Sequence, residues 1–169
     1  GYGIANELLA AQRYQEVLQN LGHDVTVAGC GLIVNPAFPW LGASPDRLAF
    51  DPVGSSYGVV EIKCPFTLRE KKGSELTTLH FCSELSENGP KLKRDHFYYA
   101  QLLGQMGVSG LSWGDFVVFG NEFILIERVR LSENESHTIK AKVDAFYFST
   151  LMPYLEDNEC LLLHAVTMQ

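Results

Sequence analysis

The chain has 169 residues, which suits one domain with a real hydrophobic core, and 46% of its residues are hydrophobic, as is ordinary for a globular protein. Its formal net charge of −7 and sequence pI near 5.2 argue against a general nucleic-acid-binding protein, because such proteins usually carry a basic excess. No apolar run approaches the roughly 20 residues that a membrane-spanning helix needs, so we expect no membrane partner.

The cysteines and histidines exclude further classes. Cys30, Cys64, Cys82 and Cys160 are widely spaced and form no C-x-x-C pair, and the five histidines have no ligand-like spacing. This pattern indicates reduced thiols in an intracellular protein rather than a disulfide framework or a structural zinc site. No phosphate-binding loop of the G-x-x-x-x-G-K-[ST] type occurs, so an ATP-driven motor is not expected in this chain.

The first third of the chain predicts a helix followed by strands. Residues 4–21 show helical spacing, with Leu8, Ala11 and Leu18 on one stripe, and Gly22 stands where a helix often ends. Residues 24–34 and 41–50 are typical of strands, the second interrupted at Pro45.

The remainder adds a buried strand, two helices and a hairpin. Residues 57–64 form a compact apolar strand that Pro65 ends, and residues 71–94 are polar and irregular. Residues 96–106 and 135–155 have helical spacing, while residues 113–119 and 123–130 flank Gly120-Asn121 as a hairpin would. The sequence therefore predicts an α/β fold, in which helices flank a sheet whose first strands form a mostly antiparallel meander.

One strand carries the residues that indicate chemistry. Glu61 and Lys63 alternate around Ile62, so they face one side of the strand while Ile62 points into the core. A carboxylate and an amine beside the buried run Val59-Val60 would be costly without a partner or a function. A hairpin would bring Asp46 from the preceding strand close to Glu61, and two carboxylates at that range repel unless a cation lies between them.

Hard oxygen ligands of this kind suit Mg²⁺, with Mn²⁺ as a substitute. The carbonyl of Ile62 is placed to add an oxygen ligand. Hydrolysis of a phosphodiester needs an activated water and charge neutralisation at phosphorus, both of which a divalent ion supplies. Lys63 could orient or deprotonate that water, or pair with the phosphate oxygens.

Four segments in order resemble one family. They are Tyr2-Gly3-x-x-x-Asn6-Glu7-x-x-Ala10-x-x-x-Tyr14, Trp40-Leu41-Gly42-Ala43-Ser44-Pro45-Asp46, Gly58-Val59-Val60-Glu61-Ile62-Lys63-Cys64-Pro65 and Tyr99-Ala100-Gln101-Leu102-Leu103-Gly104-Gln105-Met106. Together they resemble the YqaJ and lambda-exonuclease family of PD-(D/E)XK nucleases, which have a restriction-endonuclease-like core with a central mixed sheet. An isolated E-x-K is weak evidence, whereas all four segments in this order are specific.

The resemblance implies a role for each matching position. Asp46 and Glu61 match the metal-binding carboxylates, Lys63 the catalytic lysine, and Gln101 a glutamine that supports the site. Glu7 matches a helix glutamate near the metals, often through water. Arg47 departs from the family pattern, in which glycine is common, and it would alter the turn or add a phosphate contact.

The resemblance predicts a Mg²⁺-dependent deoxyribonuclease, a 5′-to-3′ exonuclease on double-stranded DNA ends in recombination or repair. The alternatives are a structure-directed or nicking endonuclease, a degenerate DNA- or protein-binding module, and, more weakly, an RNA nuclease. The acidic net charge does not oppose a nuclease, because local basic patches still steer DNA. Such a path is one interpretation of the basic residues between positions 69 and 94, and a solvated loop is the other. These residues are Arg69, Lys71, Lys72, Lys91, Lys93 and Arg94.

Three broader expectations complete this prediction. Residues 1–169 would form a single nuclease domain, from which we suspect an upstream segment is missing, since Gly1 lacks a start Met and leads straight into a helical pattern. The resemblance implies a ring-shaped trimer that threads DNA. An intracellular location is expected, nuclear if the source is eukaryotic.

Overall fold

The structure, a computed structural model, describes residues 2–72, 82–87 and 89–158. The chain falls into two compact units, Gly1–Ser132 and Glu133–Gln169, and each is described by itself. The expectation of one nuclease domain over residues 1–169 stays a prediction. Within the described residues, no helix is both long and apolar enough to cross a membrane.

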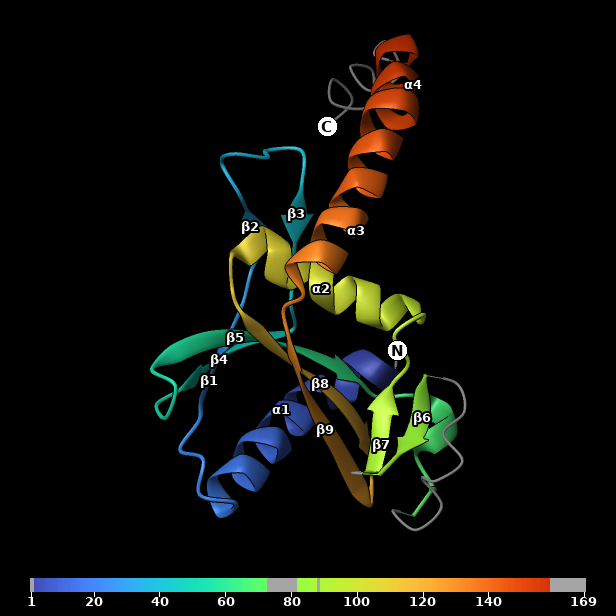
Figure 1. The fold of residues 1–169 in the computed structure, drawn as a ribbon. Helices are drawn as coiled ribbons and strands as arrows, with labels where there is room; N and C mark the ends of the chain where they lie inside the picture. The colour runs from blue at the N-terminus through green and yellow to red at the C-terminus, as the bar shows by residue number, and fades with distance from the viewer. Residues whose placement is uncertain (1, 73–81, 88, 159–169) are drawn as a thin grey trace, which may run out of the picture. The chain divides into compact units, whose positions relative to one another are not determined.

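A five-stranded mixed sheet organises the first unit (Figure 1). Its strand order is β1-β4-β5-β8-β9. β5 pairs with β8 in parallel, and the other neighbours are antiparallel. The strands are β1 (Thr26–Gly29), β4 (Arg47–Asp51), β5 (Ser56–Lys63), β8 (Trp113–Gly120) and β9 (Phe123–Arg130). The sheet confirms the predicted α/β fold with a central mixed sheet, and the β8–β9 hairpin lies where the sequence placed it.

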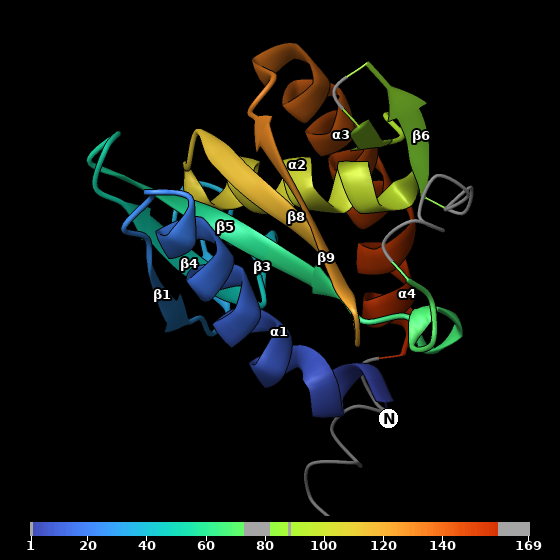
Figure 2. The same ribbon diagram turned by 90° about the horizontal axis from the view of Figure 1, so that it is seen from below.

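Two helices cover opposite faces of this sheet (Figures 1 and 2). They are α1 (Tyr2–Asn20) and α2 (Phe97–Ser109). α1 packs on the face that presents Val60 and Ile62. Strand alternation turns Val59 and Glu61 to the α2 face, where Leu102 and Val59 both lie against Gly114.

The buried stripe of α1 differs from the predicted one. Ala10, Tyr14 and Leu18 are buried at i, i+4 and i+8, with Ala11 beside them. Ala11 and Leu18 confirm part of the prediction, but Leu8 is 63% exposed, so its assignment to the core stripe was wrong. The buried stripe is rotated around the helix relative to the predicted one, so that it includes Ala10 and Tyr14 and leaves Leu8 exposed.

Each of the two strands predicted at residues 24–34 and 41–50 is divided into two shorter strands. β1 is followed by the short β2 (Ile33–Val34), which pairs with β3 (Gly42–Ala43) in a separate two-stranded sheet. Pro45 lies between β3 and β4, as the interruption at that residue predicted. Asp46 consequently lies just before β4 rather than inside a strand.

The polar stretch from residue 71 to 94 contains a hairpin that the sequence did not predict. β6 (Ser83–Ser86) pairs with β7 (Gly89–Leu92), after the short helix η1 (Phe66–Leu68) earlier in the chain. The apolar alternation of these strands is too weak to predict them. A contact with another strand of the sheet holds the hairpin in place. The N–H of Leu92 donates to Glu127 of β9 at 2.5 Å.

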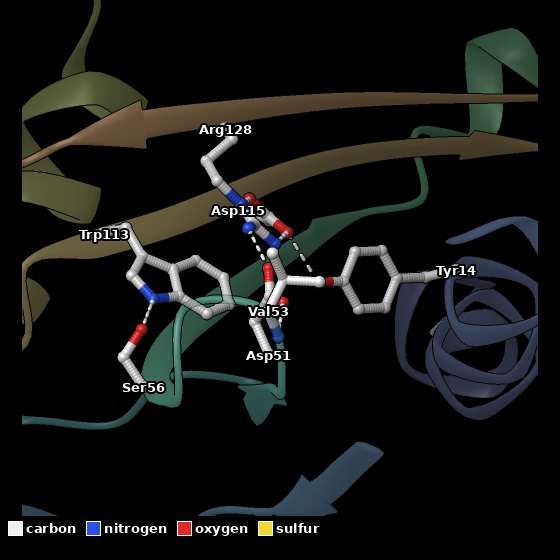
Figure 3. Close-up of polar contacts among 7 residues, drawn as sticks. All are labelled: Tyr14, Asp51, Val53, Ser56, Trp113, Asp115 and Arg128. Atoms are coloured by element: carbon white, nitrogen blue, oxygen red, sulfur yellow. Dashed lines mark hydrogen bonds and ion pairs between the residues drawn. The ribbon is translucent and has the colours of Figure 1, made fainter. Parts of the chain in front are cut away.

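A polar network ties α1 to three strands of the sheet (Figure 3). Asp115 is 1% exposed and accepts hydrogen bonds from the Tyr14 hydroxyl at 2.6 Å and from Arg128 at 2.9 and 3.0 Å. Arg128 also pairs with Asp51 and stacks on the Trp113 ring at 3.8 Å. The guanidinium therefore balances two buried carboxylates at the point where α1, β4, β8 and β9 meet.

The second unit is one helical run. It comprises α3 (Glu133–Phe146), a π-helical segment, η3 (Tyr147–Leu151), and α4 (Met152–Asp157). The run confirms the helix predicted over residues 135–155.

Candidate active site

The site lies where β5 extends beyond its pairing with the first residue of β4. β4 starts at Arg47, which pairs with Val60, so β4 offers no partner to Ile62 two residues further on. The Asp46 carboxylate takes that place, accepting a hydrogen bond from the Ile62 N–H at 2.6 Å. In a strand, the N–H and C=O of one residue point to the same edge. The Ile62 carbonyl therefore faces the side on which Asp46 lies.

Two glutamines of α2 hold the Glu61 carboxylate, which is 2% exposed. Gln101 donates to Oε1 at 2.8 Å, and Gln105 donates to Oε2 at 2.7 Å. Gln101 was expected at the site, but Gln105 was missed. The signal was present in the sequence, because Gln105 is four residues after Gln101 and so shares its helix face. The side-chain amide oxygen of Gln105 is buried and has no hydrogen-bond partner in the described part of the chain.

Lys63 lies on the same side of β5 as Glu61, as the alternation predicted. Its ammonium contacts Glu61 Oε1 at 2.5 Å and Gln101 Oε1 at 3.4 Å. It also lies over the Tyr98 ring, 4.6 Å from the centroid. These contacts fix the Lys63 head group beside the buried Glu61 carboxylate.

Asp46 is half-buried and has two other carboxylates near it. Burial raises the pKa of its carboxyl, the Ile62 N–H opposes the rise, and the charges of Glu61 and Glu7 add to it, giving a pKa of about 6. Removal from water and two like charges both disfavour the ionised form. A cation at this position would relieve both effects.

Cys64 follows the lysine but does not take part as a nucleophile. Burial, reinforced by the charges of Asp46 and Glu7, raises the pKa of its thiol to about 11. The thiolate is the reactive form, and it is scarce at neutral pH with such a pKa. Cys64 instead packs against the hydrophobic core as a partly buried residue.

Glu7 reaches the site from α1 but is engaged by another side chain. Its carboxylate accepts a hydrogen bond from Arg47 at 2.6 Å, and the same guanidinium nitrogen donates to the backbone carbonyl of Asp46. The departure from the family pattern at position 47 therefore places a cation beside the expected metal-binding acids.

The donor set fits a hard divalent ion. Among the described residues, no three acidic, histidine or cysteine side chains converge as a metal cluster. Mg²⁺ does not require one, since it is usually held by one or two carboxylates and retains several waters. Asp46, Glu61 and the Ile62 carbonyl offer two carboxylates and one neutral oxygen at the strand edge, which is sufficient for that mode of binding.

An open pocket of about 570 Å³ lies beside these groups. Its lining includes Glu7, Ile62, Lys63 and Tyr98, so it borders the lysine and Glu7, whereas Asp46 and Glu61 do not line it. The volume is enough for a nucleotide-sized ligand.

Two of the basic residues expected to guide DNA, Arg69 and Arg94, are engaged by other side chains. Arg94 pairs with Glu127 at 2.9 Å and lies over the Tyr99 ring, so it helps to fasten the β6–β7 hairpin. Arg69 stacks on Phe66 and pairs with Glu70. Residues 73–81, in the middle of this stretch, lie outside the described residues.

Comparison with known proteins agrees with the fold and the order of these segments. Residues 1–112 match the YqaJ-like viral recombinase domain, and the chain belongs to that family. A search of curated proteins gave no match.

Two solved structures of one protein are similar. The crystal structure of an alkaline exonuclease, LHK-Exo, from Laribacter hongkongensis superposes with a TM-score of 0.64 at 26% identity, covering 99% of this chain and 74% of that one. The structure of LHK-Exo in complex with dAMP gives the same score and identity, with 73% of its chain covered.

Proposed function

We propose that this chain is a divalent-metal-dependent deoxyribonuclease, acting as a 5′-to-3′ exonuclease on double-stranded DNA ends in recombination or repair. The observation that carries the proposal is the buried Glu61 carboxylate. Lys63 and two glutamines hold the Glu61 carboxylate in place. Asp46 lies near it, and a bound cation would stabilise the ionised form of the Asp46 carboxyl, whose pKa is raised. Membership of the YqaJ-like family supports the same activity.

Asp46, Glu61 and the Ile62 carbonyl are the proposed ligands of Mg²⁺, with Mn²⁺ as a substitute. When bound, such an ion acidifies water and neutralises the charge that develops at phosphorus. Asp46 is fixed by the Ile62 N–H and Glu61 by its two glutamines, so both carboxylates are oriented before the ion arrives.

Lys63 and Gln101 complete the proposed catalytic group. The Lys63 ammonium is close enough to the pocket to pair with a phosphate oxygen, where a positive charge stabilises the extra charge of the transition state. Gln101 bonds both Lys63 and Glu61, so it keeps the cation and the carboxylate in register. We therefore assign it the role of a positioning residue.

The similar structures support an exonuclease over the endonuclease alternative. LHK-Exo is described as an alkaline exonuclease and has been solved with dAMP. A deoxynucleoside monophosphate is what an exonuclease releases from DNA. The pocket beside Lys63 is of a size to hold one.

The test is a substrate panel with the full chain. Linear duplex DNA carrying a 5′ or a 3′ end label, closed circular duplex, single-stranded DNA and RNA are incubated with Mg²⁺ or with a chelator. We expect the 5′ label to appear early as a mononucleotide and the 3′ label to be retained in long fragments. Closed circles should resist until they are linearised.

The same panel separates the alternatives. Equal cleavage of closed and linear DNA would replace the exonuclease by the endonuclease. Early release of the 3′ label would reverse the polarity. Binding without cleavage under every condition would leave the degenerate binding module, and preference for RNA would refute a deoxyribonuclease.

The trimer implied by the family resemblance is part of the proposal. Its test is light scattering of the full chain, with and without a DNA end. A molar mass of about three chains supports it, and a monomer that nevertheless degrades DNA would remove it.

A further inference from the structure

Arg47 and Glu7 form a part-buried ion pair at the edge of the proposed metal site. The Arg47 side chain is 19% exposed and that of Glu7 is 29% exposed, with 2.6 Å between the guanidinium and the carboxylate. The same nitrogen also donates to the Asp46 backbone carbonyl. The Arg47 guanidinium thus links the side chain of Glu7 to the backbone of Asp46, and both residues were expected to bind the metal.

The pair is held on the α1 side of the sheet. Arg47 is directly opposite Val60 in the antiparallel ladder, so their side chains share a face, and Val60 packs against α1. Glu61 lies on the other face, beneath α2. Glu7 therefore approaches the strand edge from the opposite side to Glu61, with Asp46 between them.

We propose that Arg47 is a built-in cation that keeps Glu7 out of the metal's ligand set, so that each chain binds one divalent ion. The inference rests on the proposed function and concerns how many ions that site takes. Asp46, Glu61 and the Ile62 carbonyl hold the ion, and the Arg47 guanidinium supplies the second positive charge that an ion at Glu7 would otherwise bring.

Three physical features support this role. A guanidinium stays charged throughout the accessible pH range, so its charge cannot be removed by deprotonation. The Arg47 backbone is fixed between Gly29 of β1 and Val60 of β5, which limits how far the side chain can withdraw. A divalent ion at Glu7 would also lie close to the guanidinium and be repelled by it, because both are cations in a part-buried setting.

Metal counting on the full chain tests the proposal without relying on activity. Mn²⁺ is titrated into the protein, and free Mn²⁺ is measured by electron paramagnetic resonance. The variants are Arg47→Met, Arg47→Lys, Glu7→Gln and the double variant Arg47→Met with Glu7→Gln. Arg13→Met is the matched control, because Arg13 forms an exposed ion pair with Glu16 at 3.3 Å, on the same helix as Glu7. Circular dichroism establishes that each variant is folded.

The wild type, Arg47→Lys and Arg13→Met should each bind one Mn²⁺ per chain. Glu7→Gln should change the Mn²⁺ dissociation constant by less than about twofold, far below the 10- to 100-fold loss typical when a group that supports a metal is removed. Arg47→Met should gain a second ion, and the double variant should lose it again.

Three results would overturn the inference. They are two ions in the wild type, a loss of about tenfold or more in Mn²⁺ affinity for Glu7→Gln, and no second ion in a folded Arg47→Met. Each of these leaves a metal site at Asp46 and Glu61 in place. Absence of any Mn²⁺ binding by the wild type is a different result, and it refutes the metal dependence in the proposed function itself.

Discussion

Replacing Arg128 by methionine should destabilise the fold strongly, although Arg128 lies outside the proposed active site. The change keeps much of the side-chain length over Trp113 but removes the charge that balances Asp51 and Asp115. Breaking a buried ion pair from one side costs about 3–5 kcal/mol. The Arg128 side chain keeps 28% exposure, so solvent screens part of the effect and we expect about 3 kcal/mol.

Urea unfolding followed by circular dichroism at pH 7 measures this loss. At roughly 2–4 °C for each kcal/mol in a chain of this size, the melting temperature should fall by about 6–12 °C. Arg130→Met is the matched control, since Arg130 is an exposed residue of the same strand, and it should stay within about 0.5 kcal/mol of the wild type. Adding Asp51→Asn to Arg128→Met should recover part of the loss, because one unpaired charge is then removed.

The pH dependence gives an independent check. The hydrogen bond from Arg128 lowers the pKa of Asp51 below its ordinary value. This contribution to stability is therefore present above the unfolded pKa of about 3.9 and is lost as pH falls through the lower folded pKa. The difference between the wild type and Arg128→Met should shrink on acidification below about pH 4. A difference under about 1 kcal/mol at pH 7, or one unaffected by acid, would refute the reasoning.

Other predictions concern packing, the glutamine pair and the choice of metal. A methyl group on Gly58 would overlap the Trp113 ring, so Gly58→Ala should destabilise the fold by about 1–3 kcal/mol. Gly104 lies within α2 and a methyl group there would meet no other atom, so Gly104→Ala should stabilise the fold by up to about 1 kcal/mol. Equal melting temperatures for these two variants would contradict the packing described here. Gln105→Leu should weaken Mn²⁺ binding by about 10- to 100-fold and slow cleavage while the protein stays folded, because Glu61 loses one of its two amide donors; unchanged Mn²⁺ affinity would show that Gln105 only fills space. Ca²⁺ should support binding of a DNA end, measured by fluorescence anisotropy, without supporting turnover, since it prefers looser coordination than Mg²⁺. Efficient cleavage in Ca²⁺ alone would count against the mechanism.

Much of the site could be predicted because it follows from strand alternation. Glu61 and Lys63 had to share a face once residues 57–64 formed a strand, and Ile62 had to enter the core. Pro45 marked the break that leaves Asp46 just before β4. The catalytic roles of these residues, like the DNA substrate and the intracellular location, stay predictions until they are measured.

What could not be predicted depends on contacts between distant segments. The Arg47–Glu7 pair joins residues 40 positions apart. Leu8 fits a helical stripe as well as Ala10 does, but the buried face of α1 is the one that carries Tyr14, which bonds Asp115, a residue 101 positions away. The β6–β7 hairpin has little apolar alternation, and it is held through Glu127 of another strand. No local pattern carries that information.

Asp46→Asn offers the most direct test of the proposed active site. Asparagine can still accept the hydrogen bond from the Ile62 N–H, so the change removes the charge while the contact that fixes the side chain is retained. The measurement is single-turnover release of 5′-labelled nucleotide from linear duplex DNA with Mg²⁺, with melting temperature as the control for folding. We predict a fall in rate of about a thousandfold or more, as expected when several kcal/mol of charge stabilisation are lost. A folded Asp46→Asn variant that releases nucleotide within about tenfold of the wild-type rate would contradict the assignment of Asp46 to the metal site.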